Sequence, residues 1–290
     1  MARSKFGRSH ATKLTSPPLM LAEYLRRLGI ARPARADLSG LSQLMRAHSR
    51  LIPFENCDVV LRRKISMARA DVARKLVQDG RGGYCFEMNT LLQMALEEMG
   101  FEVVPLLCRV RWNKPDDADA PNTTFTHMAL KVMMEEGIYL ADLGFAGINS
   151  IEPVRLDTSE PQLLPEGQFR VVKGRPGYDL LQLFVKGEWR PLYTWRDEEA
   201  PLVDLELSNW YSCTCPAARF TSSFFVCRVI EDERHHILND TYVVRKGHGI
   251  ESIVNTTKIS NKAHLLELLA SVFDLHFPRD IEGLDRFLEQ

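Results

Sequence analysis

The chain has 290 residues, of which 45% are hydrophobic and 26% are charged, a balance typical of globular proteins with a large buried core. Its formal net charge is -1, so composition gives no reason to expect nucleic acid or an anionic membrane as a partner. No apolar run approaches the length that crosses a bilayer, and the sequence therefore predicts a soluble protein.

The cysteines and the N-terminus bear on the compartment. The six cysteines are sparse and irregularly spaced, and the N-terminus lacks the apolar core of a secretory signal. We therefore expect reduced thiols and a cytoplasmic protein. The basic stretch 1–19 is interpreted as a flexible tail. Cys213 and Cys215 form an isolated thiol pair, which is a poor zinc signature, so no metal is predicted.

Residues 20–102 are predicted to form a helical bundle. Apolar residues recur at helical spacing in three stretches, which end near Gly29, Pro53 and Gly100. A further short helix is predicted with Asp71 as its N-cap.

The hydrophobic period then changes from helical to strand-like. In 103–208, the runs 126–134 and 138–143 alternate as strands do, and several shorter runs follow, which indicates an antiparallel β-barrel. Residues 209–290 mix both periods and are predicted to form an α/β lid. The predicted fold class is α+β and multi-domain, with an N-terminal helical bundle, a central antiparallel β-barrel and a C-terminal α/β lid.

Cys85 is the first candidate for chemistry. Gly82 and Gly83 place a flexible turn directly before it, and it opens a predicted helix. The free amides and the dipole at a helix N-terminus favour a thiolate over a thiol. A buried structural cysteine remains an alternative on these features alone.

A thiolate nucleophile needs a base and a group that orients the base, and His127 and Asp142 are the candidates. His127 lies at the start of one predicted strand, and Asp142 lies at the end of the next. A two-residue loop at 135–136 would put both side chains on one face of the hairpin, whereas a three-residue loop would separate them. A strand-edge histidine and a turn aspartate are the structural alternatives, and spacing alone does not exclude His48 or other histidines as the base.

These residues resemble a known family. The run from Arg81 to Asn89 is similar to the active-site signature of arylamine N-acetyltransferases, and the segment 53–56 resembles the family's segment upstream of the nucleophile. The segments 126–127 and 142–145 match its histidine and aspartate blocks in order and spacing, and 209–211 resembles a later block. The resemblance spans most of the chain and implies a cysteine-protease-like Cys-His-Asp core, with Cys85, His127 and Asp142 as catalytic triad.

The resemblance also implies an activity. It indicates acetyl transfer from acetyl-coenzyme A, as cosubstrate, to arylamines, arylhydrazines or N-hydroxyarylamines by a ping-pong mechanism through acetyl-cysteine. By the same resemblance, coenzyme A contacts are expected at Thr123, Thr124 and Tyr211. Acceptor contacts are expected at three further positions: Phe54, Thr126 and Phe145. Ordinary core packing is the alternative for both phenylalanines.

The sequence departs from the family pattern at a few positions. Ala146 stands where a glycine is usual, which leaves the preferred acyl donor open, and Cys213 and Ala218 replace hydroxyl residues.

Two other functions share the predicted features. An amide hydrolase or transglutaminase-like enzyme would use the same Cys, His, Asp order, and a ligand-binding protein would keep the fold without the activity.

Overall fold

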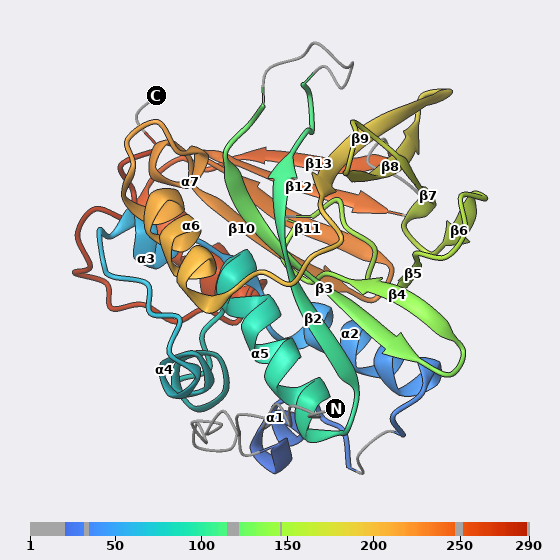
Figure 1. Ribbon diagram of the computed structural model, residues 1–290. Coiled ribbons are helices and arrows are strands. Elements are labelled where there is room, and N and C mark those ends of the chain that lie inside the picture. Colours follow the sequence, from blue (N-terminus) through green and yellow to red (C-terminus); the bar gives the residue numbers. More distant parts are fainter. Residues whose placement is uncertain (1–20, 32–34, 115–121, 146, 247–251, 289–290) are drawn as a thin grey trace, which may run out of the picture.

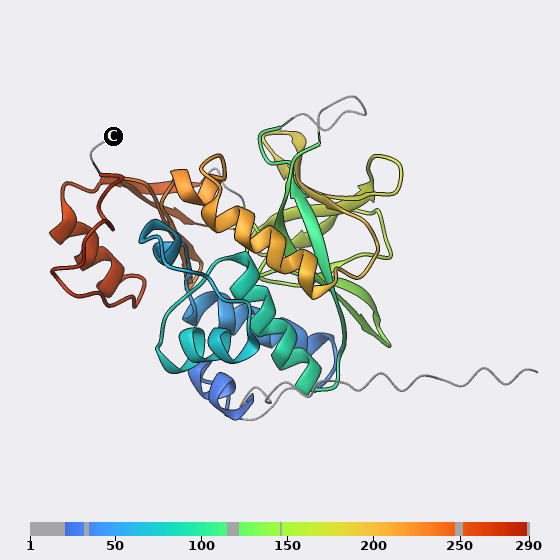
Figure 2. The ribbon, with the colours of Figure 1, turned by 60° about the vertical axis from the view of Figure 1, so that its left-hand side comes forward.

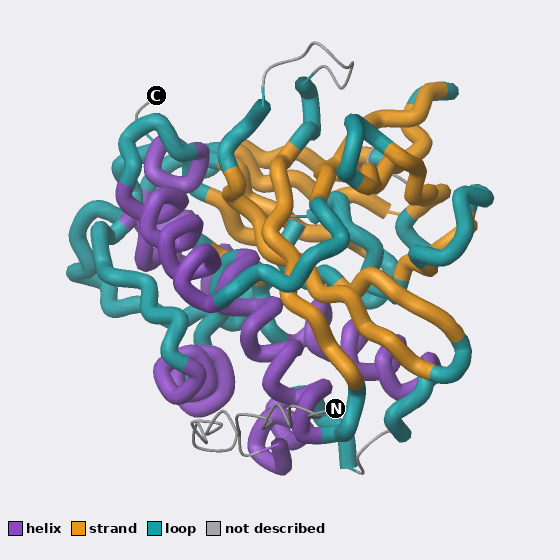
Figure 3. Tube along the Cα trace, in the orientation of Figure 1, coloured by secondary structure: helices purple, strands orange, loops and turns teal. Residues whose placement is uncertain are grey.

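The computed structural model describes residues 21–31, 35–114, 122–145, 147–246 and 252–288. The predicted tail at 1–19 and the departure at Ala146 lie outside the described residues. Helices gather on one side of the molecule and strands on the other (Figure 3). Within the described residues, no helix combines the length and the apolar composition needed to cross a membrane.

The first hundred residues are mostly helical, in agreement with the predicted periodicity (Figure 1). Their helices are α1 (Leu21–Arg27), α2 (Leu38–Leu51), α3 (Cys57–Val60), α4 (Arg69–Ala73), the π-helix η1 (Arg74–Gln78) and α5 (Cys85–Glu98). Helix α5 is the centre of this group, since eleven of its fourteen residues are buried. Such a helix is held by packing on all sides and not by one apolar stripe.

One predicted cap is wrong. Helix α4 begins at Arg69, two residues before Asp71. Asp71 accepts a hydrogen bond from the Ser66 hydroxyl (2.7 Å), and the Ser66 oxygen in turn accepts one from the Ala68 amide (3.2 Å). Asp71 therefore acts within the first turn, where a carboxylate also complements the helix dipole.

Eight antiparallel strands form the large sheet, in the order β5-β4-β3-β2-β9-β8-β7-β6. They are β2 (Glu102–Val110), β3 (Phe125–Met134), β4 (Gly137–Ala141), β5 (Val154–Arg155), β6 (Gln162–Leu164), β7 (Gly167–Lys173), β8 (Asp179–Val185) and β9 (Glu188–Trp195). The two edge strands meet, because the Gln162 side chain accepts from the Arg155 amide (2.7 Å) and donates to its carbonyl (2.9 Å). The sheet is thus a nearly closed barrel, as an α+β fold with a central barrel predicts.

A second, five-stranded sheet has the order β1-β10-β11-β12-β13. It joins a short strand from the helical region, β1 (Phe54–Glu55), to four strands from the C-terminal part of the chain, β10 (Phe225–Ile230), β11 (Glu233–Leu238), β12 (Thr241–Lys246) and β13 (Ile253–Lys258). Helix α8 (Lys262–Ser271) packs on this sheet through Leu265 and Leu269. The sequence did not predict that β1 belongs to this sheet.

Helix α6 (Leu202–Thr214) crosses between the barrel and the C-terminal sheet, above the helices of the first hundred residues (Figure 2). It is followed by the short helix α7 (Arg219–Ser222). The predicted boundary between 208 and 209 falls inside α6. The division into 20–102, 103–208 and 209–290 stays a prediction.

Candidate active site

Cys85 is the first residue of α5, as the sequence predicts. The chain before it is too crowded for side chains: a Cβ on Gly82 would lie 2.0 Å from the Pro53 carbonyl oxygen, and one on Gly83 would lie 2.8 Å from the Glu87 Cβ. The glycines are therefore required by close approach, and not by a left-handed backbone. Glu87 completes the turn by accepting a hydrogen bond from the Tyr84 amide (3.2 Å).

A buried ion cluster holds the segment before Cys85. Lys75 pairs with Glu87 and with Asp58 (both 2.7 Å), and Arg81 pairs with Glu55 (2.6 Å). Burial raises the pKa of Glu87, although the charge of Lys75 acts in the opposite direction. Removing one partner of such a cluster would leave an uncompensated buried charge, which is costly.

His127 and Asp142 lie on one face of the β3–β4 hairpin. The register pairs Leu130 with Ala141 and Met134 with Gly137, so the loop consists of Glu135 and Glu136 alone. This is the two-residue alternative, which places both side chains on the same face. Nε2 of His127 is 2.7 Å from Oδ2 of Asp142. Both residues are at least 95% buried.

Asn89 ties helix α5 to this hairpin. Its Nδ2 donates to the Met128 carbonyl (2.6 Å) and to Oδ1 of Asp142 (3.0 Å), and its Oδ1 accepts from the Leu143 amide (2.9 Å). The Gly144 amide adds a second hydrogen bond to Oδ1 of Asp142 (2.8 Å). Burial alone would raise the pKa of Asp142, but the charge and hydrogen bond of His127 and these donors outweigh it and hold the pKa below its usual value.

Replacing Asn89 by leucine is expected to lower the free energy of unfolding by about 3 kcal/mol, because three buried polar groups lose a partner while the volume is kept. Chemical denaturation followed by far-UV circular dichroism measures the change. Gln93→Leu, on the same helix, is the control: among the described residues, the Gln93 side chain bonds to Glu97 alone, one turn away. Equal stabilities for the two variants would contradict the positioning role of Asn89.

The Cys85 sulfur lies beside the hairpin, 3.7 Å from the carbonyl oxygen of Thr126. Gly144, two residues beyond Asp142, packs directly on the cysteine backbone. Burial raises the pKa of the Cys85 thiol and the Asp142 carboxylate raises it further, whereas backbone hydrogen bonds act in the opposite direction. Burial thus outweighs the helix N-terminus, so a thiolate here needs a neighbouring cation.

Aromatic rings enclose the histidine. The ring centroid of Phe145 is 5.1 Å and that of Tyr193 is 4.8 Å from that of His127. The Tyr193 hydroxyl is buried and has no hydrogen-bond partner among the described residues. Such a wall keeps water away from a reactive intermediate. The sequence singled out Phe145 but missed Tyr193, whose strand β9 reaches the site only through barrel closure.

The other predicted contact residues are more scattered. Phe54 lies in β1 and packs on Phe220 (ring centroids 5.9 Å apart). Thr123 donates to the Val110 carbonyl (2.9 Å), and Thr124 is exposed just before β3. Tyr211 lies half-buried on α6. The structure brings Phe145 and Thr126 to the Cys-His-Asp cluster, and Phe54 lies in the same hydrophobic core as Cys85. The roles of Phe54, Thr123, Thr124 and Tyr211 stay predictions.

A cysteine, a histidine and a carboxylate held together in an α+β fold are typical of enzymes that act on acyl groups. Comparison with known proteins narrows this class. A family model described as N-acetyltransferase matches residues 37–281. The arylamine N-acetyltransferase of Mycolicibacterium smegmatis is 35% identical over 91% of this chain and 94% of its own, and that of Escherichia coli is 32% identical over 80% and 82%. The chain belongs to the arylamine N-acetyltransferase family.

Solved structures agree with this assignment. The M. smegmatis enzyme superposes with a TM-score of 0.84 at 33% identity and covers 92% of this chain and 97% of its own. The Mycobacterium marinum arylamine N-acetyltransferase in complex with CoA superposes with a TM-score of 0.83 at 29% identity, over 92% and 98% of the two chains.

Proposed function

We propose that this acetyltransferase transfers acetyl groups from acetyl-coenzyme A to arylamines, arylhydrazines or N-hydroxyarylamines by a ping-pong mechanism with Cys85 as the nucleophile. The observation that carries the proposal is the His127–Asp142 pair (2.7 Å) beside a buried cysteine at a helix N-terminus. The names of relatives support two of these substrate classes, since one relative, from Salmonella typhimurium, is named as both an arylamine N-acetyltransferase and an N-hydroxyarylamine O-acetyltransferase.

In the first half-reaction, the Cys85 sulfur attacks the thioester carbonyl. A bond forms between sulfur and the acetyl carbon, the bond from that carbon to the coenzyme A sulfur breaks, and coenzyme A leaves as its thiol with a proton from His127, which is then neutral. His127 in its protonated form balances the charge on Cys85 before attack. Asp142 fixes the imidazole through Nε2, which leaves Nδ1 for the cysteine side.

In the second half-reaction, the amine nitrogen attacks the acetyl carbon of acetyl-cysteine. The carbon–sulfur bond breaks, and the amine proton passes to His127. Phe54, Thr126 and Phe145 are proposed to contact the acceptor, and Thr123, Thr124 and Tyr211 to contact coenzyme A. The rings of Phe145 and Tyr193 would limit hydrolysis of the intermediate.

Mass spectrometry of the intact protein mixed with acetyl-coenzyme A tests this mechanism. The expected result is one added acetyl group on Cys85, which disappears when an arylamine is supplied and reappears as acetylated amine. The Cys85→Ala variant should gain no acetyl group. Loss of the acetyl group to water at the same rate with and without amine would favour the hydrolase alternative.

The rate at which Cys85 is alkylated near neutral pH should fall when His127 is replaced. Burial raises the pKa of the thiol, so without an imidazolium partner the thiol stays protonated at neutral pH. In His127→Ala, iodoacetamide should label Cys85 slowly at pH 7, and the rate should rise about tenfold for each pH unit up to at least pH 9, because only the thiolate reacts. In the unmodified protein, labelling should already be fast near pH 7. Identical pH profiles would contradict the ion pair.

A further inference from the structure

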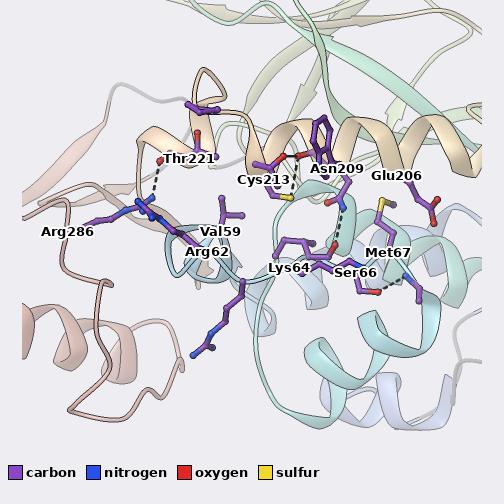
Figure 4. Close-up of a pocket in the computed structure, with 16 residues that line it drawn as sticks. Val59, Arg62, Lys64, Ser66, Met67, Glu206, Asn209, Cys213, Thr221 and Arg286 are labelled. Atoms are coloured by element: carbon purple, nitrogen blue, oxygen red, sulfur yellow. Dashed lines mark hydrogen bonds between the residues drawn. The ribbon is translucent and has the colours of Figure 1, made fainter.

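A concave site lies between helix α6 and the segment 62–68 (Figure 4). It is a hollow of about 960 Å³ between the segment after α3, one face of α6 and the C-terminal segment. Four cationic residues line it: Arg62, Arg63, Lys64 and Arg286. Glu206 is the one acidic residue among the lining residues. The whole chain has a formal charge of -1, so this excess of positive charge is local.

Arg62 and Arg286 lie together in this hollow, and no ion pair joins either of them to a carboxylate in the part of the chain that the structure describes. Figure 4 shows the ends of their side chains next to one another beside Thr221. Arg286 donates to the Thr221 backbone carbonyl (3.0 Å), and its Nε is buried with no partner among the described residues. Burial lowers the pKa of Arg286, and the charge of Arg62 lowers it further. Two like charges held together are destabilising unless an anion joins them.

The backbone at Arg62 adds an independent observation. Helix α3 ends in a Schellman motif, since the Arg63 amide bonds to the Asp58 carbonyl (2.8 Å) and the Arg62 amide to the Val59 carbonyl (3.0 Å). Arg62 occupies the left-handed position of this motif, with φ 55°. Glycine is the usual residue there because it adopts this conformation without steric cost. The chain instead holds a strained arginine whose guanidinium reaches the hollow, and strain of this kind concentrates at functional sites.

We propose that the hollow is a binding site for a phosphate-bearing small molecule, with Arg62 and Arg286 holding the phosphoryl oxygens. Guanidinium groups match phosphate geometry with paired N–H donors, and arginine is the preferred residue for such contacts. The volume lies in the range of small-molecule sites. Trp210, which is 61% exposed, also lines the hollow.

The site is separate from the acetyl-transfer chemistry. None of Cys85, His127 and Asp142 lines the hollow. Its wall contains Asn209, which accepts a hydrogen bond from the buried Tyr84 hydroxyl and donates to the Ile65 carbonyl (3.2 Å). Tyr84 immediately precedes Cys85 in the chain. A ligand in the hollow would therefore lie next to Asn209, which holds the Tyr84 hydroxyl, and would not contact the Cys85 sulfur, because Cys85 does not line the hollow.

Titration calorimetry with inorganic pyrophosphate at low ionic strength tests the site, with Arg62→Gly as the main variant. Glycine relieves the backbone strain, so the melting temperature should stay equal or rise, while pyrophosphate binding should weaken at least about tenfold. Lys186→Gly is the matched control, because Lys186 is an exposed cation at φ 53° in another turn. It should bind pyrophosphate like the unmodified protein.

Two further arms complete the experiment. Arg286→Gln should weaken binding as Arg62→Gly does, and pyrophosphate should slow the labelling of Cys213, which lines the hollow. Coenzyme A, itself a phosphate carrier, is titrated in parallel. If Arg62→Gly weakens its binding as well, the hollow serves the acyl donor's phosphates; if not, it serves a different phosphate compound. Undetectable pyrophosphate binding by the unmodified protein, or equal binding by Arg62→Gly and Lys186→Gly, would overturn the proposal.

Discussion

The Cys85→Ser variant is expected to lose at least about a thousandfold in kcat for acetyl transfer. A serine hydroxyl has nearly the size of the thiol, so the packing of Gly144 against residue 85 should be kept. The hydroxyl, however, is far less acidic than a thiol and stays un-ionised at neutral pH, so it is a much weaker nucleophile than the thiolate. Steady-state kinetics with an arylamine acceptor measure the loss, and the melting temperature should change little.

Cys215→Ser is the matched control for this loss. Cys215 is the half-buried residue at the C-terminal end of α6, and it does not line the hollow described above. The same change of sulfur to oxygen there should leave kcat within about twofold, because substitutions away from a site have small effects. Acetyl transfer by Cys85→Ser at the original rate would show that the acetyl group does not pass through this cysteine.

Gly144→Ala is expected to destabilise the protein by about 3 kcal/mol and to lower kcat about a hundredfold. Its Cβ would lie 2.4 Å from the Cys85 Cα and 2.6 Å from the Cys85 Cβ. Real Cβ atoms do not approach so closely, so the start of α5 and the end of the β3–β4 hairpin would have to move apart. This movement would displace the nucleophile from His127 and Asp142.

Gly174→Ala separates this effect from the general cost of replacing a glycine. Neither Gly144 nor Gly174 has a left-handed φ, so alanine is compatible with both backbones. At Gly174 the nearest atom to the new Cβ would be the Leu180 Cβ at 3.4 Å, an ordinary contact. Denaturation curves and steady-state kinetics should show a near-neutral change at residue 174 and a severe one at residue 144. Equal effects would contradict the role of close packing against Cys85.

Part of the candidate site could be predicted from local pattern. The glycines before Cys85 are a short-range feature, whereas the sequence left a two-residue and a three-residue loop at 135–136 open, and only the strand register decides between them. The role of Asn89 could not be predicted, because its hydrogen bonds reach residues 39 to 54 positions away along the chain. Tyr193 was missed for the same reason, since β9 joins β2 only in the folded sheet.

The fold was predicted less completely in the C-terminal third. Strands β10 and β12 contain runs of apolar residues of the kind that predict strands, whereas β11 and β13 are mostly polar. Strand β11 contains the polar run from Glu233 to His236 and is mostly half-buried, so it has no clear alternation. Strand β13 lies at the edge of its sheet and is largely exposed. Apolar alternation identifies strands that have one buried face, and neither β11 nor β13 has such a face.

The pairing of β1 with β10 limits how early the region around β1 can finish folding during synthesis. Asn56 bonds through its side chain to the Phe220 and Ser223 carbonyls and to the Phe225 amide, which lies 169 residues further along the chain. At about 5–20 residues per second, these partners leave the ribosome roughly 8 to 34 seconds after Asn56 does. Strand β1, which precedes Cys85 in the chain, therefore stays unpaired with β10 until more than three quarters of the chain has been made. A nascent chain that stalls before β10 would carry all three residues of the cluster and still lack the strand that supports them.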